Sequence, residues 1–318
     1  MFPSVLQQQI EKLLEGVKLS DVPYQALSQK YRGERQVSAR LLQSAPEAMA
    51  YAAVRMPATF GAVSEALQKI IEVFDFSPQT MLDVGAGTGA CGWAAQGLFD
   101  LKNLICLERE SVMRDLGKTL MSNNEYPVLS QAQWYDFDLL RDDIAYKADL
   151  VTASYIINEL PDVEKEKAIL KLWQATEQVL LIVEPGTSQA FAGLLKLRDF
   201  LVSQGAHIIA PCPHQKECPL NGGDWCHFSA RIARSRLHRQ LKSAEMGYED
   251  EKYCFMAFSR QPLALSYNRV LKEPKVSKAE VVCELCTDNG ECLIKKISIK
   301  DKADYKKAKK MSWGDIYC

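Results

Sequence analysis

Apolar residues recur at helical spacing through the first 75 residues of the chain. Val5, Ile10 and Leu13 would share one face of a helix, and the same spacing returns over Val63–Phe74. The pattern predicts an N-terminal helical region over residues 1–75. No catalytic pattern is evident in this region.

Between Thr80 and Pro185, short apolar runs alternate with helix-like segments. This alternation indicates parallel strands joined by crossover helices, and hence an α/β fold with a doubly wound, Rossmann-like sheet. Ligands of such sheets lie at the carboxyl ends of the strands. We predict this core over residues 76–205, ending in a helix over Gln189–Ser203. The expected strands are Met81–Val84, Asn103–Leu107, Asp149–Ser154 and Val179–Val183.

Two further parts are predicted after the core. Residues 206–260 combine a cysteine-rich loop, an arginine-rich helix over Phe228–Lys242 and a strand over Cys254–Phe258 that returns to the sheet. Residues 261–318 form a basic extension with a β-hairpin over Val281–Ile299, because an Asp-Asn-Gly turn separates two β-prone runs there. A charged, helix-compatible stretch follows the hairpin.

A glycine loop follows the first predicted strand. Gly85, Gly87 and Gly89 alternate with other residues after the acidic Asp83, whereas dinucleotide sites space their glycines as G-x-G-x-x-G. The backbone must turn there while approaching a ligand too closely for a β-carbon. The loop is closer to one that binds S-adenosylmethionine, although a generic strand-to-helix turn has the same glycines.

Acidic residues follow the second and third predicted strands. Glu108 lies at the end of the second strand, where its carboxylate would accept hydrogen bonds from a ribose hydroxyl pair. Asp136 and Asp138 follow the third strand and would receive the adenine amino group. The alternative is that all three are surface acids.

Polar residues also follow the fourth strand. Asn158 could align an acceptor for methyl transfer, and Glu159 could take a proton from it. Glu159 could equally cap a helix or form an ion pair. The segment lacks the Asn/Asp-Pro-Pro-aromatic run of amino-methylating enzymes, and it has no cysteine nucleophile. The later Glu184-Pro185-Gly186 segment is either a turn or part of the site.

Three cysteines in one loop, Cys212, Cys218 and Cys226, indicate a metal centre. Five and seven residues separate them, which is wider than the pairs of a structural zinc site and suits a four-iron cluster. His214 and His227 keep a Cys₃His zinc site open. A fourth thiolate must come from elsewhere, and the candidates are Cys254, Cys283, Cys286 and Cys292, with Cys286 beside the hairpin turn preferred. Cys91 and Cys106 are expected to be buried apolar side chains.

Charge is unevenly distributed along the chain. Residues 231–318 hold 19 Lys and Arg against 12 Asp and Glu, a net charge of about +7, which leaves about −8 for residues 1–230. A basic module on an acidic body suggests a polyanionic partner such as RNA, although a solvated surface has the same composition. In the predicted basic helix, Arg231, Arg234 and His238 share one face with Lys242 one turn further on, and this stripe would contact RNA phosphates.

The composition, with 47% apolar and 25% charged residues, is that of a globular protein. No run of eighteen apolar residues is present, and residues 1–14 resemble neither a signal peptide nor a mitochondrial presequence. We therefore expect a soluble monomer of a bacterial-type cytoplasm that makes no membrane contact. Ten cysteines in a reducing compartment are more plausible as metal ligands and buried thiols than as disulfides.

Taken together, these motifs resemble a methyltransferase-like family of small-ribosomal-subunit assembly factors, known from mitochondria and with bacterial relatives. The resemblance implies a class I S-adenosylmethionine-dependent methyltransferase fold, a [4Fe-4S] cluster and association with 16S-type rRNA of the small subunit. The family's late cluster ligand falls in a Leu-Cys pair before a turn, which matches Leu285-Cys286. The marks of the resemblance are Arg55–Thr59, Asp83–Gly89, Asn158–Leu160, Glu184–Gly186, the cysteine run with Trp225-Cys226-His227-Phe228, and Trp313–Asp315.

Three functions are compatible with these features. The first is an enzyme that methylates rRNA during assembly of the small subunit. The second is a non-catalytic assembly factor that keeps the cofactor site as a structural or regulatory element. The third is a zinc-containing methyltransferase of small molecules.

Overall fold

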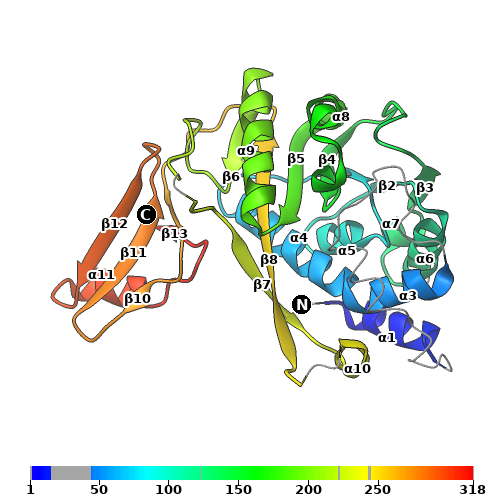
Figure 1. Cartoon of the computed structure of the whole chain (residues 1–318), viewed down its shortest axis with the longest axis horizontal. Coiled ribbons are helices and arrows are strands. Elements are labelled where there is room, and N and C mark those ends of the chain that lie inside the picture. The colour runs from blue at the N-terminus through cyan, green and yellow to red at the C-terminus, as the bar shows by residue number, and fades with distance from the viewer. Residues whose placement is uncertain (1, 16–43, 123, 221–222, 243–244, 318) are drawn as a thin grey trace.

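The computed structural model of the chain describes residues 2–15, 44–122, 124–220, 223–242 and 245–317 (Figure 1). Its largest feature is an eight-stranded sheet in the order β3-β2-β1-β4-β5-β8-β6, with β7 paired to β8. The strands are β1 (Thr80–Val84), β2 (Asn103–Glu108), β3 (Gln133–Asp136), β4 (Ala148–Ser154), β5 (Thr176–Pro185), β6 (His207–Ala210), β7 (Phe228–Ala233) and β8 (Tyr248–Ser259).

The first five strands are parallel to one another, and β8 runs antiparallel to both β5 and β6. This order, with one antiparallel strand between the fifth and sixth, is that of a class I methyltransferase sheet. All four predicted parallel strands are confirmed, and so is the return of Cys254–Phe258 to the sheet.

Helices cover both faces of the sheet. The helices on one side are α1 (Ser4–Leu13), α3 (Ala45–Val54), α4 (Met56–Ile71), α5 (Ala90–Gln96), α6 (Ser111–Ser122) and α7 (Pro127–Ser130), and those on the other are α8 (Asp162–Ala175) and α9 (Ser188–Ser203). The predicted helix over residues 189–203 is confirmed. The predicted N-terminal helical region is confirmed over α1, α3 and α4, and its residues 16–43 lie outside the described residues.

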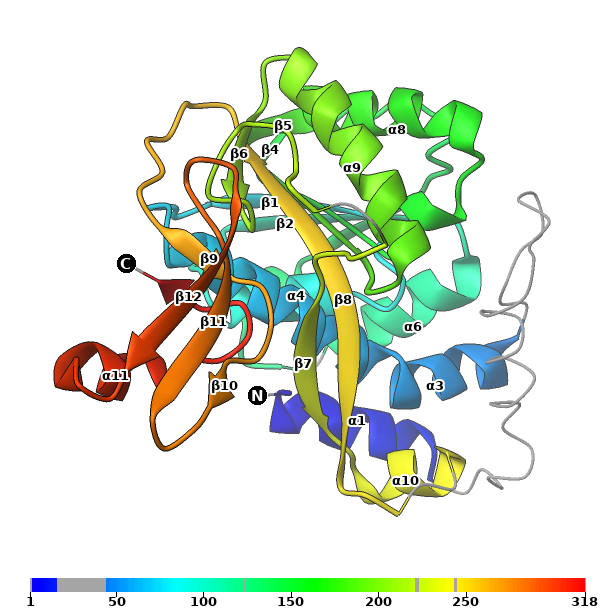
Figure 2. The same cartoon turned by 60° about the vertical axis from the view of Figure 1, so that its left-hand side comes forward.

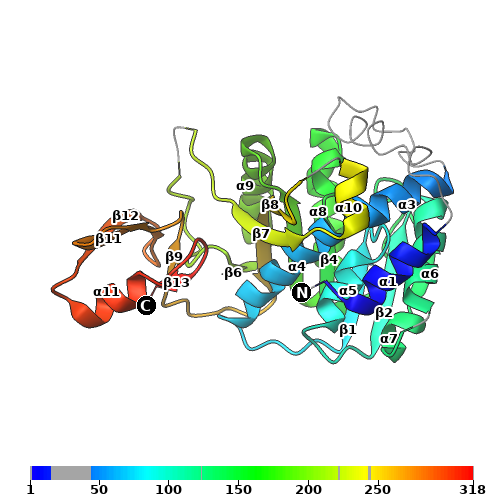
Figure 3. The same ribbon diagram turned by 90° about the horizontal axis from the view of Figure 1, so that it is seen from below.

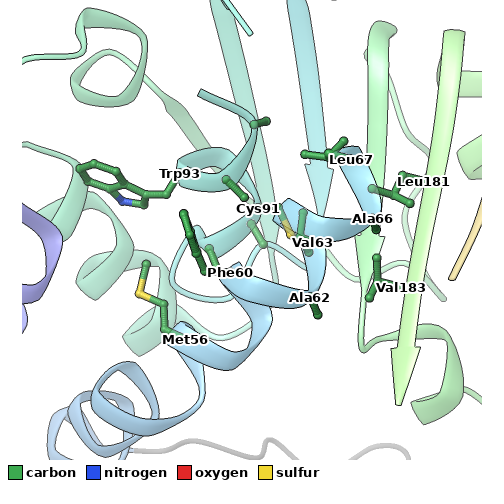
Figure 4. Close-up of a cluster of buried hydrophobic side chains, with 14 of the residues drawn as sticks. Met56, Phe60, Ala62, Val63, Ala66, Leu67, Cys91, Trp93, Leu181 and Val183 are labelled. Carbon is green, nitrogen blue, oxygen red and sulfur yellow. The ribbon is translucent and has the colours of Figure 1, made fainter. Parts of the chain in front are cut away.

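Burial on both faces explains why the strands are continuously apolar. In β5, Leu181 and Val183 belong to the core under α4, whereas Leu180 and Ile182 belong to the core under α8 and α9. Figure 4 shows Leu181 and Val183 beside the residues that α4 turns towards the sheet. Two separate apolar layers therefore fix the sheet and hold the carboxyl ends of its strands in place.

Strand β8 is long, and it takes part both in the main sheet and in a two-stranded ribbon with β7. Its last residues lie between β5 and β6, and its first residues pair with β7 in a ribbon that extends beyond the sheet (Figure 2). A short helix, α10 (Arg236–Lys242), follows β7 at the far end of this ribbon.

A second, five-stranded sheet forms the C-terminal part of the molecule, and the predicted hairpin is confirmed as β11 and β12 with Cys286 opposite Cys292. The buried side chain of Arg269 joins this sheet to the cysteine loop, since it donates to the carbonyl oxygens of Pro211 (3.1 Å) and Gly314 (2.9 Å). Its elements are β9 (Asn268–Val270), β10 (Lys275–Val276), β11 (Glu280–Cys286), β12 (Cys292–Ser298), α11 (Lys302–Ala308) and β13 (Ile316–Tyr317).

Within the described ranges, no helix has both the length and the hydropathy that a membrane span requires. The predicted division into parts at residues 75, 205 and 260 stays a prediction.

Candidate functional site

The glycine loop lies at the carboxyl end of β1, and its three glycines have different physical roles. All have positive φ, at 71° for Gly85, 56° for Gly87 and 85° for Gly89. A β-carbon at Gly85 would lie 2.4 Å from the Ile156 side chain, and one at Gly89 would lie 2.3 Å from Met121. At Gly87 a β-carbon would meet a side chain only at 3.5 Å, an ordinary contact. Packing therefore disfavours a β-carbon at position 85, and at position 89 the flexible end of Met121 would have to move, whereas the loop at Gly87 has room for a β-carbon on its open side.

Two buried acids, Glu108 and Asp83, lie beside this loop and make different contacts. Glu108 accepts hydrogen bonds from the backbone N–H groups of Gly87 and Glu110, both at 2.8 Å, and burial raises its pKa. Asp83 is fully buried and accepts a hydrogen bond from the Thr152 hydroxyl at 2.6 Å. Burial raises the pKa of Asp83 to about 6. Glu108 therefore binds the backbone of the loop, while Asp83 ties β1 to β4 beneath it.

The third acidic position lies next to Glu108. Asp136 ends β3 directly opposite Glu108 in the sheet register, and its exposed carboxylate lies 3.1 Å from Nη1 of Arg114. Asp138 is half-buried, and its carboxylate accepts from the backbone N–H of Leu140 at 3.0 Å. The acids predicted for ribose and adenine are thus neighbours at one edge of the sheet, and their binding roles stay predictions.

The proposed catalytic residues lie in a short 3₁₀ helix, η2 (Ile157–Glu159), after β4. Asn158 is exposed and Glu159 is half-buried. The turn is held by Glu184, whose Oε1 accepts from the backbone N–H of Ile157 at 2.9 Å. Burial raises the pKa of Glu184 to about 8, and its Oε2 is buried with no hydrogen-bond partner among the described residues. Glu184 is therefore a support for the Asn158–Glu159 turn.

A polar cluster that the sequence did not indicate lies over the same edge. Arg55, between α3 and α4, donates to both carboxylate oxygens of Glu251 at 3.3 and 3.1 Å, and the Tyr155 hydroxyl donates to the same carboxylate at 3.2 Å. Tyr155 has φ 60°, a conformation that non-glycine residues adopt mainly where surrounding contacts impose it. Arg55 was a mark of the family resemblance, but no local signal connects it with a partner 196 residues away.

The four preferred cysteines line one cavity. Cys212, Cys218 and Cys226 come from the loop, and Cys286 comes from β11. The other candidates for the fourth position lie elsewhere. Cys254 is buried with its sulfur 3.2 Å from the Pro185 carbonyl, Cys283 belongs to the core of the C-terminal sheet, and Cys292 is exposed. Cys91 and Cys106 are buried as expected.

Ionised cysteines are unfavourable in this cavity. Burial raises the pKa of Cys226, and the neighbouring thiols of Cys212 and Cys286 raise it further. Burial also raises the pKa of Cys212, although the Arg198 guanidinium counteracts it. His214 is buried with Nε2 3.3 Å from the sulfur of Cys286. Among the described residues, no three His, Cys, Asp or Glu side chains come close enough together to hold a single metal ion.

The prediction of one basic helix over Phe228–Lys242 is wrong. Residues Phe228–Ala233 form strand β7, and only Arg236–Lys242 are helical. The physical reason is a period of two: Phe228, Ala230 and Ile232 are buried, while the side chains between them point outwards. Arg231 lies at an outward position of the strand, and Arg234 follows its end, so the two do not form a helical stripe.

The four residues of the predicted stripe therefore share no helical face, and acids of β8 bind them. Arg231 pairs with Asp250 at 2.8 Å, and Arg234 pairs with Glu249 at 2.8 Å. Lys242 also pairs with Glu249, and the buried His238 lies 3.4 Å from it. RNA binding by Arg231, Arg234, His238 and Lys242 stays a prediction, and its expected geometry is absent from these described residues.

Solved structures with a similar fold include two methyltransferases at low identity. Magnesium protoporphyrin IX methyltransferase from Synechocystis PCC 6803 is 13% identical, with a TM-score of 0.43, and the match covers 74% of this chain and 90% of that one. The N-methyltransferase NodS from Bradyrhizobium japonicum WM9 is 11% identical, with a TM-score of 0.44, covering 75% of this chain and 98% of the other. Such identities carry no information about the substrate.

Two curated relatives are similar over most of this chain. The human "Ribosome assembly protein METTL17, mitochondrial" is 26% identical over 292 residues, which cover 84% of this chain and 62% of that protein. The Schizosaccharomyces pombe "Rsm22-cox11 tandem protein 2, mitochondrial" is 24% identical, covering 97% of this chain and 48% of that protein. This chain thus spans less than two thirds of the length of either relative. Their mitochondrial names do not support the expected bacterial-type cytoplasm, which stays a prediction.

A family model described as "Mitochondrial small ribosomal subunit Rsm22" matches residues 45–318. The match begins at α3 and includes the glycine loop, the cysteine cavity and the C-terminal sheet. The kind of family expected from the motifs is therefore confirmed, and the chain belongs to the Rsm22 family of mitochondrial small-ribosomal-subunit proteins.

Proposed function

We propose that this protein binds S-adenosylmethionine at the carboxyl edge of its sheet and acts on or with the rRNA of the small subunit during ribosome assembly. The observation that carries the cofactor proposal is the open side of Gly87 next to Glu108. When bound, the cofactor supplies a sulfonium methyl group that a nucleophile can displace.

The residues present fit this ligand. Glu108 is fixed by two backbone N–H groups, so its position is set before any ligand arrives. An ionised carboxylate has about four acceptor sites, and two remain for the ribose hydroxyls. Asp136, its neighbour in the sheet, is exposed and would receive the adenine amino group.

Isothermal titration calorimetry with S-adenosylmethionine tests this site. Gly87→Leu should weaken binding at least about 30-fold, equivalent to about 2 kcal/mol, because its side chain would fill the open side of the loop. Gly193→Leu is the matched control, since its α-helical position also has open space. Because a leucine at positive φ strains the loop, Glu108→Gln provides a second variant, and circular dichroism verifies that each variant folds. Unchanged affinity in both Gly87→Leu and Glu108→Gln would refute the site.

The family match supports the ribosomal part of the proposal, together with a relative named as a ribosome assembly protein. In the catalytic form of the proposal, Asn158 aligns the acceptor and Glu159 takes its proton. The non-catalytic form has one observation in its favour: Arg55, Tyr155 and Glu251 bind one another at the same edge. Comparing methylation of small-subunit rRNA from cells with and without the gene separates the two forms.

We further propose a [4Fe-4S] cluster on Cys212, Cys218, Cys226 and Cys286. The thiols around this cavity, with Cys286 buried and the other three partly buried, resist ionisation, and metal binding would supply the compensating positive charge. A single tetrahedral zinc ion with bonds of about 2.3 Å needs its sulfurs within roughly 4 Å of one another, whereas a cluster accepts wider spacing. The support for the cluster is the convergence of the four cysteines on one cavity.

Anaerobic purification tests the cluster. The protein should be brown and contain iron and sulfide, and Cys286→Ser should remove most of the visible absorbance. Cys283→Ser is the matched control, because Cys283 belongs to the core on the other side of the same strand. Colourless protein with stoichiometric zinc would refute the cluster and favour the zinc-containing methyltransferase instead.

A further inference from the structure

The segment that contains β12 and α11 carries a dense run of cations. Residues 292–310 hold eight lysines and two aspartates, a net charge of +6. All eight lysines are exposed. We call the lysines of residues 292–310 the lysine surface.

No lysine of this surface forms an ion pair with any carboxylate in the described ranges. Arg231, Arg234 and Lys242, at the β7–β8 ribbon, behave differently, since Glu249 and Asp250 bind them. Within the lysine surface, Lys295 lies over the Tyr317 ring at 5.0 Å, a contact that leaves its positive charge uncompensated. The ammonium groups are therefore available to an external anion.

The position of this surface also suits an external partner. Strand β12 pairs only with β11 in the described part of the chain, so one edge of β12 is open. Figures 1 and 3 place β12 and α11 at the end of the molecule opposite to β3 and α6. Ile294, on β12, is 65% exposed. A large partner could reach this end without covering the glycine loop.

We propose that the lysine surface is the part of the protein that grips the phosphate backbone of small-subunit rRNA; the inference rests on the proposed ribosomal function. Lysine is a flexible point charge that binds phosphate without reading base edges, so the contact would hold and orient the RNA with little sequence preference. The acidic remainder of the chain, about −8 over residues 1–230, would repel RNA and direct it to this end.

Protection of a sheet edge is another use for exposed lysines, since charge on an open strand prevents pairing with a second copy. That explanation covers Lys295 and Lys296 of β12. It does not cover the lysines of α11 and the turn after it, because a helix has no open edge to protect. The combination of strand and helix lysines therefore favours a polyanion.

A filter-binding experiment with protein-free small-subunit rRNA tests the inference on the full-length chain. The test variant combines Lys296→Ala, Lys300→Ala, Lys306→Ala and Lys307→Ala. The matched control combines Lys118→Ala, Lys147→Ala, Lys167→Ala and Lys196→Ala, which removes the same charge from exposed positions of the main domain. The test variant should bind at least about tenfold more weakly at 100 mM salt, and its salt slope should fall by about 3, because each lost contact with single-stranded RNA accounts for about 0.7. The control should bind like the wild type.

The outcomes separate the inference from the function on which it rests. If the wild-type protein does not bind the rRNA, the ribosomal proposal itself fails. If the wild type binds and the two variants lose equal affinity, total charge is responsible and the lysine surface is refuted. If the test variant keeps its affinity for rRNA but no longer binds intact small subunits, a ribosomal protein occupies the surface, and the RNA assignment is overturned.

Discussion

At the carboxyl edge of the eight-stranded sheet, charged side chains bind one another or the backbone, whereas in the C-terminal sheet the lysine surface faces solvent. Arg55 is held by Glu251, and Glu108 is held by two backbone N–H groups. The eight lysines of residues 292–310 have no carboxylate partner in the described part of the chain. In the first region the charges hold one another and the backbone in place, and in the second they are uncompensated.

The comparison also teaches that basic composition alone does not identify a binding surface. The segment Phe228–Lys242 and the segment of residues 292–310 are both rich in cations. They differ because β8 brings Glu249 and Asp250 alongside Arg231, Arg234 and Lys242 of the first segment. Although burial acts against it, hydrogen bonds from Lys242 and Arg234 lower the pKa of Glu249, so it stays ionised and binds these two cations.

The largest expected effect comes from removing Glu251, whose carboxylate binds Arg55 and Tyr155 at the carboxyl edge of the sheet. Glu251→Ala should lower the free energy of unfolding by about 3 kcal/mol, because Arg55 would lose its counter-charge and Tyr155 its acceptor. Urea denaturation measures the difference.

Asp250→Ala is the matched control for this prediction. Asp250 neighbours Glu251 on β8 but points to the other face, and its pair with Arg231 is exposed to solvent. Solvent screening makes such pairs weak, so the control should lose far less stability. Equal losses in the two variants would break the comparison, because the partly buried Arg55–Glu251 pair would then have no special role.

A smaller, pH-dependent effect is expected at Glu184. Its pKa is raised from the ordinary 4.5 to about 8, so the folded state keeps a proton that the unfolded state has already released. The stabilisation is complete below pH 4.5 and is lost as the pH rises towards 8, at roughly 1.4 kcal/mol for each pH unit. Glu184→Gln, which is neutral at every pH, should lack this dependence.

Urea denaturation of both proteins at pH 5, 6, 7 and about 8 measures this difference in slope. Glu166→Gln, an exposed position on α8, is the control and should leave the slope unchanged. Parallel pH profiles for wild type and Glu184→Gln would mean that Glu184 is ionised in the fold and that its role at the turn needs another explanation.

Sequence reasoning succeeded where the structure depends on neighbouring residues. The parallel strands, the glycine loop and the hairpin each carry their signal within a few residues, through apolar runs, positive-φ glycines or an Asn-Gly turn. The preference for Cys286 comes from the family resemblance, through the Leu-Cys pair before the turn, and Cys286 lies on the wall of the cysteine cavity.

Sequence reasoning failed where contacts between residues far apart in the chain determine the structure. Helical and strand periods both fit the short arginine-rich segment, and pairing with β8 selects the strand. The Arg55–Glu251 pair joins residues that no local pattern connects. The sequence does not separate a turn from a site at Glu184–Gly186, because the burial of Glu184 depends on residues outside its own segment.

The smallest expected effect is the change in protein stability when four lysines of the lysine surface are replaced. Combining Lys296→Ala, Lys300→Ala, Lys306→Ala and Lys307→Ala should change the free energy of unfolding by less than about 0.5 kcal/mol, because exposed side chains without partners contribute little. Any change should be a slight gain at low salt, since removing like charges reduces their repulsion, and it should vanish at high salt. Thermal unfolding at two salt concentrations measures it. A large loss of stability would show that these lysines hold the C-terminal sheet together, and the contrast with the main sheet would disappear.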